Sequence, residues 1–226
     1  MIHVHRSQCE STQKLAIELS KQHSEEVLVS CEEQISGEGQ RGKEWHSADQ
    51  AIAISFTTWP SDIYSLSSLE MAVLTRQFLL KKFNVSTQFK WPNDLFNMDR
   101  KKCGGILIQN SGDRLVVGIG INIYQGDIPS ELTQMGSLFN SPQRVDIETV
   151  SKELRYYIMD NRMPSNTILS QWEKHCLHLK EEIEVIESNG KYRAKFKGVG
   201  EYGQAIVELD GKNTELFSAS LVIDPR

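Results

Sequence analysis

Hydrophobic and polar positions follow two different rhythms along this chain. Up to about residue 177, short apolar runs of strand length alternate with segments in which apolar residues recur every three or four positions, as on one face of a helix. After residue 180, apolar residues fall mostly at alternate positions in short runs, which indicates strands only. The pattern therefore predicts a larger mixed domain over residues 1–178 and a small β-domain over residues 179–226.

The larger part is expected to mix helices with strands. The expected helices are a short one that begins at Ser11 and Thr12, a long amphipathic one over residues 66–83, one that opens at Asp146, and one over residues 168–176. The expected strands cover residues 27–29, 51–56, 89–91, 105–109 and 115–123, with a hairpin turn at residues 110–113. Residues 51–56 are apolar nearly throughout, which predicts a strand covered on both faces.

The tail has the composition of a small β-barrel. The pairs Asn189-Gly190 and Asp210-Gly211 are hairpin turn sequences. About 45 residues of short strands make a thin core, so this piece is expected to lean on the larger domain. Four basic residues alternate along one expected strand and share one face of it, which fits an edge strand protected against aggregation or a docking strip for an acidic carrier domain: Lys191, Arg193, Lys195 and Lys197.

Composition narrows the classes of function. The chain has 226 residues, 39% hydrophobic and 24% charged, which is an ordinary globular mixture. Its net charge of −5 argues against a nucleic-acid binder, and no apolar run approaches the ~20 residues of a membrane span. The N-terminus has no signal-peptide core, and the four cysteines form no CxxC pair. We therefore expect a cytoplasmic protein with free thiols.

Residues 36–45 read SGEGQRGKEW and form a glycine-rich loop. Residues 37–42 spell GxGxxG, but a dinucleotide fold needs a helix to begin inside that motif, and here a polar stretch and then a strand follow. The dinucleotide interpretation is therefore rejected. Glycines let backbone N–H groups approach a ligand closely, so the loop is either part of a binding site or a plain surface loop.

Three further motifs follow in order. Residues 90–95 read KWPNDL and place Asn93 and Asp94 at the end of a strand, where a structural turn is the alternative. Residues 102–107 read KCGGIL, in which Lys102 has room beside it for a phosphate or carboxylate, although a lone lysine is usually solvated. Residues 118–122 read GIGIN, in which the glycines suggest close ligand approach or a bulge, and Asn122 suits an adenine edge.

Each motif is weak alone, but their joint order is specific. A glycine-rich loop that ends in Trp45, followed by KWPND, KxGGIL and GIGIN, resembles the catalytic domain of biotin–protein ligases, over roughly residues 8–140. The resemblance implies an α+β fold of the class II aminoacyl-tRNA synthetase-like type, with a mixed sheet and helices, followed by a small SH3-like β-barrel. It also implies the short form of the family, without an N-terminal DNA-binding domain.

The resemblance implies an activity as well. Family members use ATP and Mg²⁺ to convert biotin into biotinyl-5′-AMP, and then transfer biotin to a lysine of the biotin carboxyl carrier domain of an acyl-CoA carboxylase. A homodimer through a sheet edge is compatible with such a fold. Two alternatives remain: a non-catalytic relative that binds biotin or a nucleotide, and a lipoate or octanoyl ligase of the same superfamily.

The family's functional residues map onto this sequence by motif. Lys102 matches the key lysine, which touches biotin and phosphate, and Asp94 matches the acidic residue that supports it. The biotin-binding positions are Ser11, Thr12, Gln13, Gln34, Glu38, Gly39, Gln40, Lys102 and Gly105. The nucleotide-binding positions are Gly37, Gly42, Lys43, Trp45, Asn93 and Asn122. No residue is assigned to a protein-held metal or to a general base.

The sequence departs from the family pattern in the loop. The usual motif is GRGRxGRxW, and its arginine positions here carry Glu38, Gln40 and Lys43. The resemblance implies that those arginines hold the phosphate of biotinyl-AMP, so a looser lid and faster release of the adenylate are expected. Arg41 is a candidate source of a replacement guanidinium, and Gln13 stands where asparagine is usual.

Two pairs of histidines invite a metal hypothesis. His175 and His178 lie three apart on an expected helix, and His3 and His5 share one face of a strand. Neither pair has a third ligand that converges on it, so we expect surface histidines and no metal site.

Overall fold

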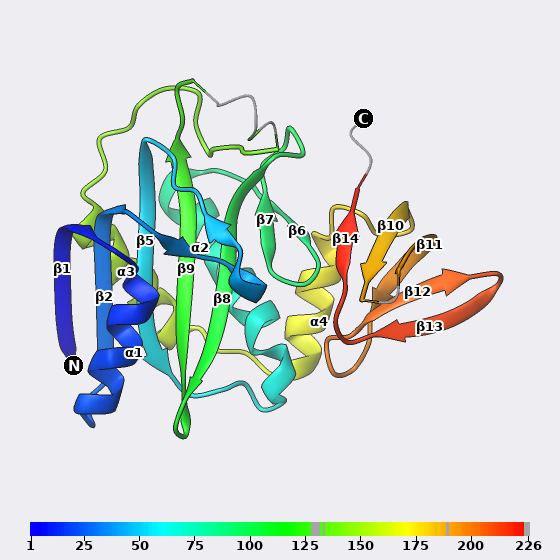
Figure 1. Ribbon diagram of the computed structural model, residues 1–226, viewed down its shortest axis with the longest axis horizontal. Helices are drawn as coiled ribbons and strands as arrows, with labels where there is room; N and C mark the ends of the chain where they lie inside the picture. The colour runs from blue at the N-terminus through cyan, green and yellow to red at the C-terminus, as the bar shows by residue number, and fades with distance from the viewer. Residues whose placement is uncertain (128–131, 133, 189, 224–226) are drawn as a thin grey trace.

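The computed structural model describes residues 1–127, 132, 134–188 and 190–223. It consists of a larger domain around a seven-stranded mixed sheet and a smaller domain around a five-stranded antiparallel sheet, which lie side by side in Figure 1. In the larger sheet, β1 and β2 are parallel and every other neighbouring pair is antiparallel. Its strands, in spatial order, are β1 (Ile2–Cys9), β2 (Val27–Gln34), β5 (Gln50–Thr58), β9 (Arg114–Tyr124), β8 (Lys102–Ser111), β7 (Asp94–Phe96) and β6 (Gln88–Lys90).

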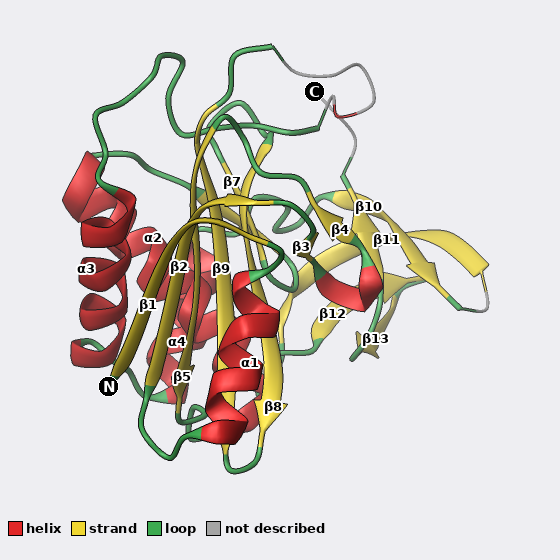
Figure 2. Cartoon of the chain, turned by 60° about the vertical axis from the view of Figure 1, so that its left-hand side comes forward, coloured by secondary structure: helices red, strands yellow, loops and turns green. Residues whose placement is uncertain are grey.

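Helices cover both faces of this sheet. Helix α1 (Thr12–Gln22) lies on one face, and α2 (Ser67–Phe83), α3 (Ile147–Asp160) and α4 (Ser165–Lys174) lie on the other (Figure 2). Strand β5 contacts both α1 and α3, so all its residues after the first are buried, as its apolar sequence predicts. Ser11 and Asp146 cap α1 and α3, which also confirms the prediction for those helix starts.

Some boundaries differ from the prediction. Helix α4 ends at Lys174, before Cys176, because the chain there turns to pair with β6: the Phe89 N–H donates to the His175 carbonyl and the Leu177 N–H to the Phe89 carbonyl. Trp91 lies in the turn after β6 rather than in the strand. The hairpin between β8 and β9 is confirmed, while the expected turn residue Asn189 lies outside the described residues.

The smaller sheet corrects one expectation about the basic strip. Its strands, in spatial order, are β13 (Lys212–Leu216), β12 (Ala205–Leu209), β11 (Gly190–Val199), β10 (Glu182–Glu187) and β14 (Ser220–Val222). The basic strip lies on β11, which has a neighbour on each side, so the edge-strand interpretation is wrong. Cross-strand carboxylates pair with the strip instead: Glu184 lies 3.3 Å from Lys191, and Glu208 lies 2.9 Å from Lys197.

The smaller domain leans on the larger one through a shared apolar core. Trp172 of α4 is fully buried and stacks on Phe89 of β6, with ring centroids 5.8 Å apart. The same indole lies 6.5 Å from the ring of Phe196 on β11. One cluster of buried side chains thus runs from the large sheet into the small one, as the thin core of the tail predicts.

His178 contradicts the expectation of surface histidines. It is fully buried, and its ring centroid lies 4.2 Å from that of Phe196. Burial lowers the pKa of His178 to about 3, with Lys90 and Arg100 acting in the same direction. Among the described residues, no three His, Cys, Asp or Glu side chains gather where they could hold a metal ion. His178 is therefore a neutral core residue.

His178 makes folding sensitive to acid. Its pKa is about 3 in the folded protein and about 6.5 when unfolded, so between about pH 6.5 and pH 3 the unfolded chain binds the proton and the folded protein does not. Stability attributable to this residue should fall by about 2 kcal/mol between pH 7 and pH 5. Urea denaturation of wild type and His178→Gln at both pH values checks this. Equal losses in the two proteins would show that His178 is not responsible.

All four cysteines are free, and burial raises the pKa of the Cys103 thiol to about 12 and that of Cys176 to about 12 as well. Within the described ranges, no helix is both long and apolar enough to cross a membrane.

Candidate functional site

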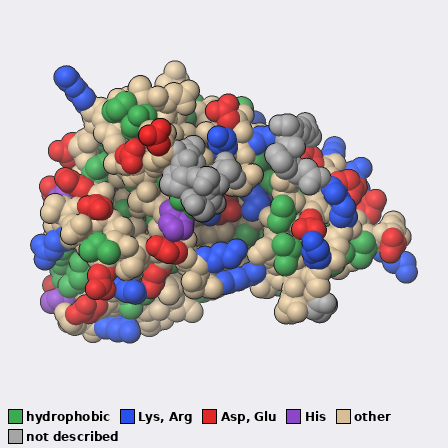
Figure 3. Space-filling view, turned by 45° about the horizontal axis from the view of Figure 1, so that its top comes forward, with side chains coloured by type: hydrophobic (Ala, Val, Ile, Leu, Met, Phe, Trp, Pro, Cys, Tyr) green, Lys and Arg blue, Asp and Glu red, His purple; other side chains and the backbone are tan. Residues whose placement is uncertain are grey.

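A cavity of about 380 Å³ lies over β8 and β9, between the glycine-rich loop and the smaller domain. Figure 3 shows the hollow between the two domains, with basic side chains gathered in it. Most of the site residues predicted from sequence line this cavity: Ser11, Thr12, Gln13, Gln34, Glu38, Gly39, Gln40, Lys43, Trp45, Asn93, Asp94, Lys102 and Gly105. Gly37, Gly42 and Asn122 do not line it.

A chain of hydroxyl and amide groups forms one end of the cavity. The N–H and the hydroxyl of Thr12 both donate to Gln34 Oε1, at 2.8 and 3.0 Å. Thr12 Oγ1 lies 2.9 Å from the hydroxyl of Ser55, which donates to Gln13 Oε1 at 3.0 Å. Helix α1 and strands β2 and β5 thus bring together residues that are far apart in the sequence. Ser55 was not predicted, because it lies inside an apolar strand without a motif of its own.

The two glycines of GIGIN make room for side chains of the site. A Cβ atom on Gly118 would lie 2.6 Å from Gln13 Oε1, and one on Gly120 would lie 2.7 Å from the indole of Trp45. Gln13 cannot easily yield, because its Nε2 donates both to Gln109 and to the carbonyl of Val116. Close approach of side chains therefore explains these glycines, where a ligand or a bulge was expected.

The glycine-rich loop folds back over the sheet. Strands β3 (Gly37–Glu38) and β4 (Glu44–Trp45) pair with each other and are joined by a short 3₁₀ turn, η1 (Gln40–Gly42). The loop ends with the Trp45 ring packed against Gly120, and Lys102 Nζ lies 5.4 Å from the centroid of that ring. The loop and β8 therefore meet across the cavity.

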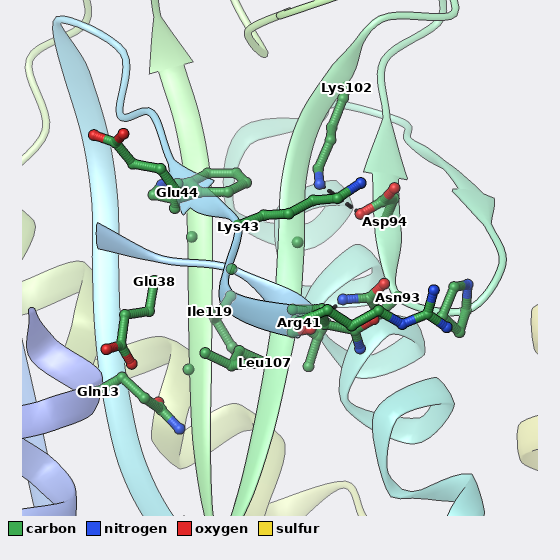
Figure 4. A pocket seen from close by; sticks show the side chains of 18 of the residues that line it. Gln13, Glu38, Arg41, Lys43, Glu44, Asn93, Asp94, Lys102, Leu107 and Ile119 are labelled. Carbon is green, nitrogen blue, oxygen red and sulfur yellow. Dashed lines mark hydrogen bonds and ion pairs between the residues drawn. The ribbon is translucent and has the colours of Figure 1, made fainter. Parts of the chain in front are cut away.

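The other end of the cavity holds a cluster of two lysines around one carboxylate. Asp94 Oδ1 lies 2.6 Å from Lys102 Nζ, and Oδ2 lies 3.4 Å from Lys90 Nζ (Figure 4). Burial alone would raise the pKa of Asp94, but the two ammonium groups outweigh it and hold that pKa below its usual range. Burial lowers the pKa of Lys90, and the positive charge of Lys102 adds to this, while Asp94 opposes it. The cluster carries net positive charge, and Lys90 was not predicted as part of it.

Two asparagine side chains connect separate backbone segments through hydrogen bonds. Asn93 lines the cavity, and its amide donates to the carbonyl of Ile106 on β8. Asn122 is buried: its Oδ1 accepts from the N–H of Ala48 at 3.1 Å, and its Nδ2 donates to the carbonyl of Gly136 at 3.1 Å. Direct contact of Asn122 with a nucleotide stays a prediction.

The altered loop residues have partners within the protein. Glu38 lies 3.4 Å from Lys14 Nζ of α1, so its charge is paired. The guanidinium of Arg41 reaches the smaller domain, where it donates to the hydroxyls of Ser218 and Ser220. The smaller domain also contributes cavity-lining residues that no sequence motif marks: Ile186, Ala219, Ser220, Leu221 and Val222.

Known proteins resemble this chain along most of its length. The bifunctional ligase/repressor BirA of Bacillus spizizenii is 28% identical over 233 residues, which cover 93% of this chain and 70% of that protein. The protein of the same name from Escherichia coli is 26% identical over 198 residues, 80% of this chain and 61% of that protein. A structure of the biotin protein ligase from Aquifex aeolicus in complex with biotin and ATP has a TM-score of 0.78 at 24% identity, covering 97% of this chain and 98% of that one.

The structural similarity confirms the predicted α+β fold. It has a mixed sheet with helices, followed by a C-terminal sheet that fits an SH3-like domain. Residues 4–125, more than half of the chain, match the family model described as the biotin/lipoate A/B protein ligase family. The chain belongs to the biotin/lipoate A/B protein ligase family.

Proposed function

We propose that this chain is a biotin–protein ligase that converts biotin and ATP into biotinyl-5′-AMP and transfers the biotin to a lysine of a biotin carboxyl carrier domain. The observation that carries the proposal is one cavity with two different ends. Neutral hydrogen-bonding groups around Thr12 form one end, and the cationic cluster around Asp94 forms the other. The named relatives support it, including a biotin–[acetyl-CoA-carboxylase] ligase of Paracoccus denitrificans that is 27% identical over 125 residues, 50% of this chain and 51% of that protein.

The neutral end suits the head group of biotin. A ureido ring carries N–H donors and a carbonyl acceptor but no charge, and hydroxyl and amide side chains can match both. Thr12 and Ser55 hydroxyls and the Gln13 amide present these groups, and apolar side chains line the middle of the cavity: Ile54, Ile106, Leu107 and Ile119. Such an apolar slot with a few convergent polar groups is typical of small-molecule sites.

The cationic end suits adenylation. A biotin carboxylate oxygen forms a bond to the α-phosphorus of ATP, the bond from that phosphorus to the bridging oxygen breaks, and pyrophosphate leaves. Two anions must meet for this step, so positive charge is needed where phosphoryl charge develops. Lys102 supplies it, and Asp94 positions the ammonium group at 2.6 Å. Lys43 points from the loop toward the same end of the cavity (Figure 4).

The second step transfers the acyl group. The neutral amine of the carrier lysine attacks the biotinyl carbonyl, AMP leaves, and the amine loses a proton to solvent. The cationic cluster stabilises the departing phosphate by the same electrostatic attraction.

Mg²⁺ fits this site as an ion that accompanies the nucleotide. Mg²⁺ is usually bound by one or two carboxylates together with substrate phosphates, and Asp94 is the carboxylate within the cationic cluster. Both of its oxygens already face lysines, and the described residues contain no three-ligand cage. Bound Mg²⁺ would neutralise phosphate charge beside Lys102.

Biotin-dependent exchange of labelled pyrophosphate into ATP tests the first step. We expect exchange with biotin and none with lipoate or octanoate. Biotin binding without exchange would favour the non-catalytic alternative, and exchange with lipoate alone would favour the lipoate ligase.

Gly118→Ala should weaken biotin binding about tenfold, since the new Cβ would lie 2.6 Å from Gln13 Oε1 and overpacking costs about 1–3 kcal/mol. The double variant Gln13→Asn/Gly118→Ala shortens the obstructing side chain and should recover part of the affinity. Calorimetric titration of biotin into both variants checks this. An unchanged dissociation constant in Gly118→Ala would place biotin away from Gln13.

Gln40→Arg should slow release of biotinyl-AMP, because it returns a cation to a cavity-lining loop position beside the adenylate phosphate. A charge-assisted hydrogen bond contributes about 1.5–3 kcal/mol, which corresponds to roughly tenfold to hundredfold slower release. The release rate of labelled adenylate from wild type and Gln40→Arg is the measurement. Equal rates would remove Gln40 as the cause of loose retention.

A further inference from the structure

The side chain of Arg41 joins the glycine-rich loop to the smaller domain. Its Nη2 donates to Ser218 Oγ at 2.8 Å and to the Ala219 carbonyl at 3.2 Å, and its Nη1 donates to Ser220 Oγ at 3.2 Å. A guanidinium is a rigid fork of donors, so three acceptors that converge on it fix its direction. The guanidinium of Arg41 is therefore bound to the other domain, and Arg41 also lines the cavity.

The backbone conformation of Arg41 turns its side chain toward the smaller domain. Its φ and ψ are 58° and 35°, in the left-handed region that non-glycine residues seldom adopt. Gly39 precedes the 3₁₀ turn that contains Arg41, and Gly42, the last residue of that turn, also has a positive φ of 72°. The tip of the loop is thus turned so that Arg41 meets the segment at residues 218–220.

That segment is part of the cavity wall. Ala219, Ser220, Leu221 and Val222 line the cavity together with Arg41 itself and with loop residues on both sides of it. Ser220 and Val222 are also the first and last residues of strand β14, which pairs with β10. A contact between Arg41 and this segment therefore closes the cavity between two walls that belong to different domains.

Other residues of the loop also contact the larger domain. Glu38 pairs with Lys14 of α1 at 3.4 Å, and Trp45 packs on Gly120. Glu38 is negatively charged and Gln40 is neutral, so Lys43 is the one cation left at the three arginine positions of the loop, and contacts to protein gain importance in holding the loop.

We propose that Arg41 and residues 218–220 form an interdomain latch, which positions the glycine-rich loop over the cavity. Its effect on adenylate retention rests on the proposed function; its effect on the loop does not. Arg41 is a positioning residue in this scheme, because its guanidinium acts on the smaller domain and not on substrate.

Hydrogen exchange of the ligand-free protein tests the latch directly. The double variant Ser218→Ala/Ser220→Ala removes two acceptors and leaves the loop sequence unchanged, so the same peptides over residues 37–45 can be compared with wild type. We expect roughly threefold to tenfold faster exchange in this peptide, since exposed hydrogen bonds to a charged group contribute modestly. Arg41→Ala, which removes all three bonds, should accelerate exchange at least as much.

A control separates the latch from a general disturbance of the smaller domain. Lys212→Ala alters an exposed residue at the start of β13, outside the cavity and the latch, and should leave loop exchange unchanged. Wild-type exchange of residues 37–45 in both Ser218→Ala/Ser220→Ala and Arg41→Ala would overturn the proposal, as would equal acceleration by Lys212→Ala.

The release rate of preformed biotinyl-AMP tests whether the latch affects adenylate retention. Arg41→Ala and the double serine variant should release it about threefold to tenfold faster than wild type, and combining all three changes should add little, because one contact is removed twice. Faster loop exchange in a protein that binds no adenylate would leave the latch standing and refute the ligase. Adenylate retention that is equal in all variants, despite faster loop exchange, would refute the role of the latch in retention.

Discussion

Replacing Lys102 by alanine is expected to lower the rate of biotin transfer by about a hundredfold to a thousandfold, the usual cost of removing one preorganised group that stabilises transition-state charge. Lys102 is the group that Asp94 holds at 2.6 Å in the cavity. Without its positive charge, the repulsion between the biotin carboxylate and the ATP phosphates would be less well compensated. Single-turnover formation of biotinyl-AMP, followed with labelled biotin, measures the loss at the chemical step.

The neighbouring residue provides the matched control. Lys101 is exposed and does not line the cavity, so Lys101→Ala removes the same charge from the chain and should retain nearly full activity. A loss in Lys101→Ala as large as in Lys102→Ala, or adenylation at the wild-type rate in Lys102→Ala, would contradict the role given to Lys102.

Trp172→Ala should reduce the free energy of unfolding by about 3–5 kcal/mol, as is typical when a large buried aromatic side chain is removed. Trp172 is completely buried and contacts Phe89 of β6 and Phe196 of β11, so its loss opens a cavity where the two domains share their core. Urea denaturation followed by circular dichroism measures the change.

Trp59→Ala is the control for this substitution, since Trp59 is 49% exposed and its removal should cost far less. If Trp172→Ala were as stable as Trp59→Ala, the shared core would not hold the domains together. If the two domains of Trp172→Ala unfolded in separate transitions, the indole would be the link that makes them unfold as one.

The sequence predicted those parts of the fold that local physics determines. Strand β5 was predicted from a run that is apolar nearly throughout, and α1 and α3 were predicted from their capping residues. The position of β11 was missed because alternating basic residues suit any strand face that reaches solvent, central or edge; only the pairing with β10 and β12 decides it. His178 was missed because its burial depends on α4 ending at Lys174.

In the site, too, the sequence predicted what short motifs determine and missed the contacts between distant segments. Motif order led to Lys102, Asp94 and Trp45, which lie in one cavity. Sequence spacing could not reveal that Arg41 reaches residues 218–220, nearly the whole chain away, or that Ser55 joins Thr12 and Gln13. Contacts of this kind arise when distant elements pack, so they carry no local signature.

The most direct test is transfer of labelled biotin to an isolated biotin carboxyl carrier domain by the wild-type protein with ATP and Mg²⁺. The account predicts covalent, ATP-dependent labelling of the carrier, lost when the acceptor lysine is replaced by arginine. Biotin that binds in the cavity but is neither adenylated nor transferred would contradict the ligase and indicate a binding protein.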